Sequence, residues 1–119
     1  MRVLVTGQNG YIGTVLIPML QDRGHEVAGL DTDYFSRCIF EGALPEMPSV
    51  RKDIRDLGSE DVEGFDAVIH LAGLSNDPLG DYKPHLTEDI NEKAAVDLAR
   101  LAKTAGVQRF LFASSCSNY

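Results

Sequence analysis

The chain alternates short apolar runs with segments of helical periodicity. Strand-like runs occur at five places: Arg2–Thr6, Glu26–Asp31, Ser49–Lys52, Asp66–Leu71 and Gln108–Ser114. Strands that alternate with helices pair in parallel through right-handed crossovers. We therefore expect an α/β fold with a doubly wound parallel sheet in the order 3-2-1-4-5. Such a sheet places a ligand crevice at the carboxyl ends of strands 1 and 4.

The segment after the first strand has the pattern of an amphipathic helix. Its apolar residues follow the i, i+3, i+4, i+7, i+8 spacing, which predicts one core-facing stripe: Ile12, Val15, Leu16, Met19 and Leu20. Gly24 lies where such a helix ends. Pro18 removes one main-chain hydrogen bond, and we expect a bend there rather than a break because the stripe continues beyond it.

A longer helix is predicted from about Pro84 to Ala105, with Gly106 as its cap. Its apolar stripe consists of Leu86, Ile90, Ala94, Leu98, Leu101 and Ala102. A shorter helix is predicted from Arg55 to Val62. The segments 33–48 and 73–83 have the composition of long loops, and long loops in compact domains are more often functional than idle.

Three glycines follow the first strand at the spacing Gly-x-x-Gly-x-x-Gly, namely Gly7, Gly10 and Gly13. One glycine turns the chain sharply, another lets main-chain N–H groups approach a pyrophosphate, and a third lets the next helix pack close to the strand. The positive end of that helix then points at the anion. Strand, turn and helix together predict a Rossmann-type dinucleotide site.

Asp31 ends the second strand, eighteen residues after Gly13. A carboxylate at this place accepts hydrogen bonds from the adenosine ribose hydroxyls and repels a 2′-phosphate, which favours NAD over NADP. The alternative is an N-cap for a turn at Thr32. Asp53 follows the third strand, where it would accept from the adenine amine while Ile54 packs on the ring; the alternative is a helix cap, and both roles are compatible.

Further candidates lie at the other strand ends. His70 is interpreted as a core histidine with a satisfied ring rather than a catalytic one. A buried amide at Asn91 would hold the fourth and fifth strand ends through main-chain bonds, and an exposed polar position is its alternative. Hydroxyls after the fifth strand, at Ser114 and Ser115, would polarise a substrate carbonyl or alcohol, although serines there are also common turn formers.

The composition narrows the class of protein. The chain has 119 residues, enough for one small domain, and 44% of them are hydrophobic, as in ordinary globular proteins. A net charge of −7 argues against nucleic acid or an anionic membrane surface as a partner. The two cysteines, Cys38 and Cys116, lack metal-ligand spacing, so no metal site is predicted and a cytoplasmic location is the default.

Taken together, these motifs resemble the extended short-chain dehydrogenase/reductase family, in its NAD-dependent epimerase/dehydratase branch. The resemblance covers the whole chain and rests on Thr6–Gly13, Asp31, Asp53–Arg55, His70–Gly73 and Asn91, with Ser114 and Ser115 just before Tyr119. It implies NAD as the cofactor and a nucleotide-activated sugar as the substrate. Family members transfer a hydride from a sugar carbon to the nicotinamide and then epimerise, dehydrate or decarboxylate the keto intermediate.

The resemblance also implies roles for individual residues. The pyrophosphate would contact Gly7, Gly10, Tyr11, Ile12 and Gly13. Asp31 would bind the ribose, Asp53 and Ile54 the adenine, and Leu71, Ala72 and Gly73 the central part of the cofactor, with Asn91 and Ser114 alongside. Ser115, four residues before Tyr119, would be the catalytic hydroxyl, and the loop that contains Ser75 and Asn76 would face the substrate.

One departure from the family pattern is decisive for activity. The family's general base is a tyrosine with a lysine four residues later, and the sequence contains no Tyr-x-x-x-Lys. We therefore expect residues 1–119 to be the NAD-binding domain of a longer enzyme, without the remaining strands and the C-terminal domain, and to be inactive alone. The alternatives are a stand-alone NAD-binding or redox-sensing module, and a family dehydrogenase acting on a non-sugar secondary alcohol.

The apolar runs Val68-Ile69 and Phe110-Leu111-Phe112 predict strands that are covered on both faces. In this chain the second run would form an exposed apolar edge. Such edges pair with other chains. We expect homodimerisation or self-association through it.

Overall fold

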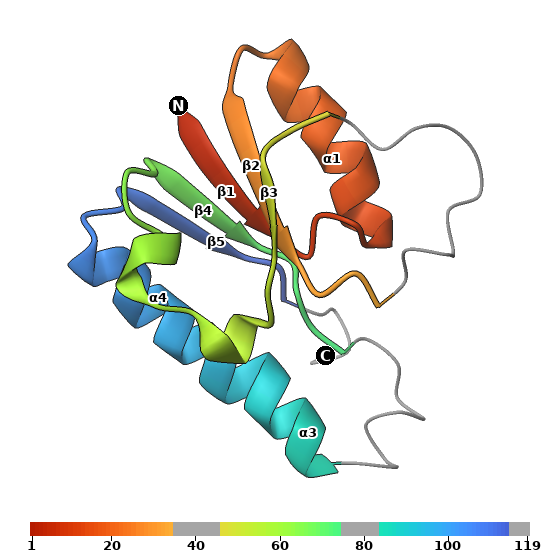
Figure 1. Ribbon diagram of the computed structural model, residues 1–119, viewed down its shortest axis with the longest axis vertical. Coiled ribbons are helices and arrows are strands. Elements are labelled where there is room, and N and C mark those ends of the chain that lie inside the picture. The colour runs from red at the N-terminus through yellow and green to blue at the C-terminus, as the bar shows by residue number, and fades with distance from the viewer. Residues whose placement is uncertain (35–45, 75–83, 115–119) are drawn as a thin grey trace.

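The computed structural model describes residues 1–34, 46–74 and 84–114. Five parallel strands form one sheet in the order β3-β2-β1-β4-β5, which confirms the predicted order (Figure 1). The strands lie within one or two residues of the predicted runs: β1 Arg2–Thr6, β2 Glu26–Asp31, β3 Ser49–Arg51, β4 Ala67–His70 and β5 Arg109–Phe112.

The register aligns the carboxyl ends of the three central strands. Thr6 lies opposite Leu30 on β2 and opposite His70 on β4. The segments that follow these strands therefore begin at one edge of the sheet. That edge is where a doubly wound sheet binds its ligands.

Helices cover both faces of the sheet (Figure 1). One face carries α1 (Tyr11–Asp22), which continues through Pro18 without a break. The other carries a long helix made of α3 (Pro84–Glu88), the π-helical segment η3 (Asp89–Lys93) and α4 (Ala94–Thr104). Gly106 follows with a φ of +80°, and its N–H donates to the carbonyl of Lys103, as expected of a helix cap.

Two apolar clusters hold these layers together. The cluster under α1 consists of Val3, Val5, Ile17, Val27 and Ala67. The larger one lies under the long helix and consists of Leu4, Leu30, Ile54, Val62, Val68, Ile90, Ala94, Leu98 and Ala102. The predicted stripe of the long helix is thus confirmed, because Ile90, Ala94, Leu98 and Ala102 are all buried.

The predicted stripe of α1 is wrong at Ile12, Val15 and Met19, whereas Leu20 packs against the cluster under α1 as predicted. Its buried residues are Gly13 and Ile17, whereas Ile12, Val15 and Met19 are each more than half exposed. A Cβ at position 13 would lie 2.3 Å from the Gln8 carbonyl oxygen. The face that carries this glycine and Ile17 is therefore the one that approaches the sheet, and the side that carries Ile12, Val15 and Met19 is turned to the outside.

The helix predicted from Arg55 to Val62 is also wrong. Two 3₁₀ turns stand in its place, η1 (Ile54–Asp56) and η2 (Ser59–Asp61), separated by Leu57 and Gly58. Asp53 caps the first turn by accepting from the Arg55 N–H at 2.9 Å. The N–H of Gly58 donates to the Asp61 carboxylate at 2.8 Å. These local bonds replace the i→i−4 bonds of an α-helix.

The strand β5 is covered on one face only, which corrects the expectation of two covered faces. Phe110 packs against the cluster under the long helix, but Leu111 and Phe112 are about half exposed, at 49% and 53%. In the described part of the chain β5 pairs with β4 alone. Among the helices of that part, none is long and apolar enough to cross a membrane.

Candidate functional site

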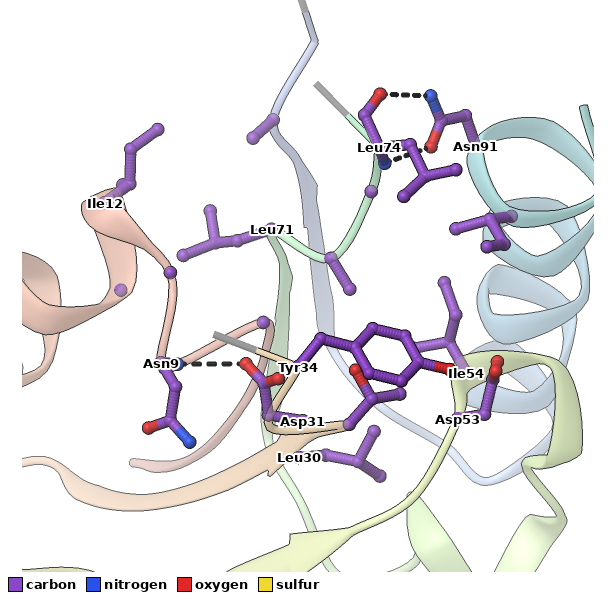
Figure 2. Close-up of a pocket in the computed structure, with 18 of the residues that line it drawn as sticks. Asn9, Ile12, Leu30, Asp31, Tyr34, Asp53, Ile54, Leu71, Leu74 and Asn91 are labelled. Carbon is purple, nitrogen blue, oxygen red and sulfur yellow. Dashed lines mark hydrogen bonds between the residues drawn. The ribbon is translucent and has the colours of Figure 1, made fainter. Parts of the chain in front are cut away.

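A cavity of about 720 Å³ lies at the carboxyl edge of the sheet (Figure 2). Its walls come from the glycine turn after β1, the ends of β2 and β3, the segment after β4, the π-helical segment and the end of β5. The described residues that line it are Gly7, Asn9, Gly10, Ile12, Gly13, Leu30, Asp31, Thr32, Tyr34, Lys52, Asp53, Ile54, Leu71, Ala72, Gly73, Leu74, Ile90, Asn91, Phe112, Ala113 and Ser114.

The glycine turn fits closely against the segment after β4. Gly7 has a φ of +75°, and a Cβ there would lie 2.7 Å from the Ala72 nitrogen. The N–H of Gly7 donates to the Leu30 carbonyl at 2.8 Å, and that of Gly10 donates to the Gly7 carbonyl at 3.1 Å. The tight turn thus delivers the N-terminal end of α1 to the cavity, where unpaired N–H groups favour an anion.

Main-chain donors fix the carboxylate of Asp31. One oxygen accepts from the Asn9 N–H at 3.0 Å and the other from the Asp33 N–H at 2.8 Å. The second bond is the local turn weighed from the sequence, so that alternative is confirmed. Binding of a ribose stays a prediction, and each oxygen keeps accepting capacity for it.

Asp53 forms a bidentate pair with Arg55, at 3.2 and 2.6 Å to one oxygen and 3.0 Å to the other. The hydrogen bonds from Arg55 hold the pKa of the Asp53 carboxyl below its usual value. The capping role is therefore confirmed. The adenine role stays a prediction, with Ile54 buried beside it at the cavity wall.

His70 is a core histidine, as interpreted from the sequence. It is 1% exposed, its Nδ1 lies 2.6 Å from the Thr6 hydroxyl, and the Phe112 ring stacks on it at 5.7 Å between centroids. Its Nε2 has no hydrogen-bond partner among the described residues, so within them the expected satisfied ring is found at Nδ1 alone. Burial lowers the pKa of His70 to about 4, so the ring is neutral near pH 7.

Asn91 holds the chain just beyond β4. Its Oδ1 accepts from the Leu74 N–H at 2.7 Å and its Nδ2 donates to the Leu74 carbonyl at 2.8 Å (Figure 2). A Cβ on Gly73 would lie 3.0 Å from the same Oδ1. The exposed-polar alternative is therefore wrong, and the main-chain bonds reach the fourth strand end; among described residues none reaches the fifth.

The remaining predicted site residues fall into three groups. Gly10, Ile12, Gly13, Leu71, Ala72, Gly73 and Ser114 line the cavity with those above. Tyr11 is not among the residues that line it, and its side chain is 92% exposed at the start of α1. Ser75, Asn76 and Ser115 lie outside the described residues, so their predicted roles remain predictions.

Sequence reasoning missed several residues of the site. Asn9, Tyr34 and Lys52 line the cavity, and Lys52 donates to Asp61 at 2.7 Å. Gln8 is 3% exposed and lies against β2, where a Cβ on Gly29 would come within 2.5 Å of its side-chain carbonyl carbon. A glycine inside a strand signals such a close approach, and Gly29 could have pointed to Gln8.

Comparison with known proteins identifies the family to which this fold and cavity belong. Residues 3–119 match the NAD dependent epimerase/dehydratase family. The chain belongs to this family. The sequence resemblance is thereby confirmed, and with it, for the family, the dependence on NAD.

Relatives of this epimerase/dehydratase chain differ in how much of them it spans. It is 34% identical to a UDP-glucose 4-epimerase of Klebsiella pneumoniae, over all of the chain and 92% of the relative. It is 32% identical to a 3-beta-hydroxysteroid dehydrogenase of Mycolicibacterium neoaurum, over 98% of the chain but 32% of the relative. A crystal structure of UDP-glucose-4-epimerase from Stenotrophomonas maltophila, with bound NAD and formylated UDP-arabinopyranose, matches with a TM-score of 0.85 at 30% identity, over 98% of the chain and 38% of that structure.

Proposed function

We propose that residues 1–119 are the NAD-binding domain of a nucleotide-sugar epimerase or dehydratase. The observation that carries the proposal is the joint placement of the Gly7 turn and the fixed Asp31 carboxylate at one cavity. The solved neighbour with bound NAD and formylated UDP-arabinopyranose supports it. The activity belongs to the full-length protein, and residues 1–119 by themselves should be inactive because they lack Tyr-x-x-x-Lys.

The residues present fit the cofactor. A Cβ on Gly7 would clash with the main chain at Ala72, so glycine allows the tight turn that brings the first N–H groups of α1 to the cavity, where they would donate to a diphosphate. Asp31 would accept from the ribose hydroxyls, and Leu30 and Ile54 would pack against the adenine. NAD, when bound, supplies a reversible acceptor for the hydride of a sugar carbon.

Other residues would orient the substrate. Asn91 fixes the main chain at Leu74, immediately before Ser75 and Asn76, which would face the sugar. Ser115 would hydrogen-bond the reacting sugar oxygen, next to Ser114 at the cavity wall. In this proposal the chain binds and orients, while proton transfer belongs to a base outside these residues.

A second candidate function is a dehydrogenase acting on a non-sugar secondary alcohol. The similarity to a 3-beta-hydroxysteroid dehydrogenase, at 32% identity, favours it. Assays of the full-length protein on UDP-sugars and on simple secondary alcohols separate the two. A stand-alone NAD-sensing module, the third possibility, would turn over neither, and a cytoplasmic location stays a prediction for all three.

Calorimetric titration of the chain with NAD and with NADP tests the proposed cofactor. We expect NAD to bind and NADP to bind at least tenfold more weakly, because the Asp31 carboxylate repels a 2′-phosphate. Asp31→Asn should narrow this difference, since the amide keeps one acceptor oxygen and loses the charge. Binding of NADP alone, or of neither nucleotide, would refute the proposal.

We also propose that the chain self-associates through β5. The half-exposed Leu111 and Phe112 support the proposal, as does the outer edge of β5, which pairs with no other strand among the described residues. Light scattering at rising concentration should show a mass above that of a monomer. Leu111→Lys should restore the monomer, because a charged edge disfavours strand pairing; a wild-type chain that stays monomeric at high concentration contradicts the idea.

A further inference from the structure

A ring of hydrogen bonds joins the turn after β2 to the glycine turn after β1. The Asn9 N–H donates to one oxygen of Asp31, and the Asp33 N–H donates to the other. The Asn9 side-chain amide closes the ring by donating to the Asp33 carboxylate. Asn9 thus contacts two carboxylates at once, and both lie at the end of the strand that carries Asp31.

The conformation of Asp33 shows that this ring constrains the main chain. Asp33 has a φ of +60°, the left-handed region that residues other than glycine seldom adopt. Such conformations persist where surrounding contacts determine them, and they cluster at functional sites. Here the contacts are the bonds to Asp31 and Asn9, so the strained turn serves to bring a second carboxylate beside the first.

We infer that Asp33 is a second determinant of cofactor selectivity. As a positioning residue it holds Asp31 and Asn9 in place, and its own charge adds to the field that a 2′-phosphate would meet beside the ribose. The inference rests on the proposed function, since it assigns a role at the same site. It differs from the role of Asp31, because Asp33 does not line the cavity and acts through charge and through the ring.

The charges around the ring support this assignment. Among the described residues that line the cavity, Lys52 is the one cation, and its ammonium group is bonded to Asp61 at 2.7 Å. Arg51 uses its Nε to donate to the Thr32 carbonyl and does not line the cavity. In the described part of the chain, the cavity wall therefore offers a phosphate no cation that is free of a carboxylate, and Asp33 adds a second negative charge beside Asp31 through the ring.

The test compares dissociation constants of NAD and NADP for the chain and three variants by calorimetry. Asp33→Asn keeps an acceptor for Asn9 and suits the left-handed conformation, so it removes only the charge. We expect it to leave NAD affinity within about twofold while the preference over NADP falls about tenfold. Asp33→Ala also removes the hydrogen bond from the Asn9 side chain and so opens the ring, and it should lower the affinity for NAD itself about fivefold. Glu63→Gln, an exposed acid elsewhere, controls for net charge and should match wild type.

Ionic strength separates charge from structure. In about 1 M KCl, charges are screened beyond about 3 Å, so wild type and Asp33→Asn should show the same preference for NAD over NADP. The lower affinity of Asp33→Ala for NAD should persist. A wild-type chain that binds NAD, with Asp33→Asn as selective as wild type at low salt, overturns the inference and leaves the proposed function standing. A wild-type chain that binds neither nucleotide overturns both.

Discussion

Gly7→Ala is expected to abolish NAD binding and to lower the free energy of unfolding by about 3 kcal/mol. The alanine must adopt a φ of +75°, which costs an L-residue roughly 1–2 kcal/mol. Its Cβ would also lie 2.7 Å from the Ala72 nitrogen and 2.8 Å from the Ala72 Cα, so main chain has to move. Urea unfolding measures the stability, and calorimetric titration measures the binding.

Gly24→Ala provides a matched control for this prediction. Gly24 has a φ of +81°, close to that of Gly7, but a Cβ there meets nothing within 4 Å. Gly24→Ala should therefore lower the free energy of unfolding only by the cost of the left-handed conformation, about 1 kcal/mol, and bind NAD as wild type does. Equal losses of stability and binding in the two variants would show that the contact of the turn with Ala72 is irrelevant.

The second large effect is a loss of stability in mild acid that depends on His70. Burial places the pKa of His70 at about 4 in the folded chain, against 6.5 when unfolded. Between these values the unfolded state binds the extra proton, so stability falls as the pH is lowered from 6.5 towards 4, by about 3 kcal/mol in all. Above pH 6.5 the contribution is fully present.

His70→Leu should remove this dependence of the free energy of unfolding on pH, as measured by urea unfolding at a series of pH values from 7 to 4. The pKa values of Asp53, Asp61 and Asp89 are lowered from 3.8 by their hydrogen bonds to Arg55, Gly58 and Lys93, so these carboxylates titrate below the window. The variant's absolute stability is not the criterion, because leucine leaves the Thr6 hydroxyl without its partner. A wild-type slope that survives in His70→Leu would contradict the assignment.

The sheet was predictable because its signals are local. Each apolar run has its own boundaries in composition, and the parallel order follows from the alternation of runs with helical segments. The face of α1 was not predictable from apolar spacing. Gly13 counts as neutral in such a pattern, yet the absence of its side chain decides which face approaches the sheet, as its contact with the Gln8 main chain shows.

The candidate site divides in the same way. The spacing of Gly7 and Asp31 in the sequence predicts that they belong to the site, and both line the cavity. Asn9 could not be predicted from spacing. It acts through its main-chain N–H, which donates to Asp31, and through its side-chain amide, which donates to Asp33 in the turn after β2. The two 3₁₀ turns after Asp53 were not predicted either. They form because the Asp53 and Asp61 carboxylates accept main-chain N–H groups, and the periodicity of apolar residues carries no information about such bonds.

The five-residue π-helical segment explains the unusual spacing of the core-facing apolar row of the long helix. Leu86, Ile90, Ala94, Leu98 and Ala102 are spaced by four throughout, and in a uniform α-helix each such step drifts by about 40° around the axis. A wider turn, closed by i→i+5 bonds at Asp89–Lys93, rotates the row back. Removing one residue from that segment would turn everything after it by about 100° and point Leu98 away from the sheet. This stretch of helix therefore has to preserve its length as well as the side chains of Ile90 and Asn91.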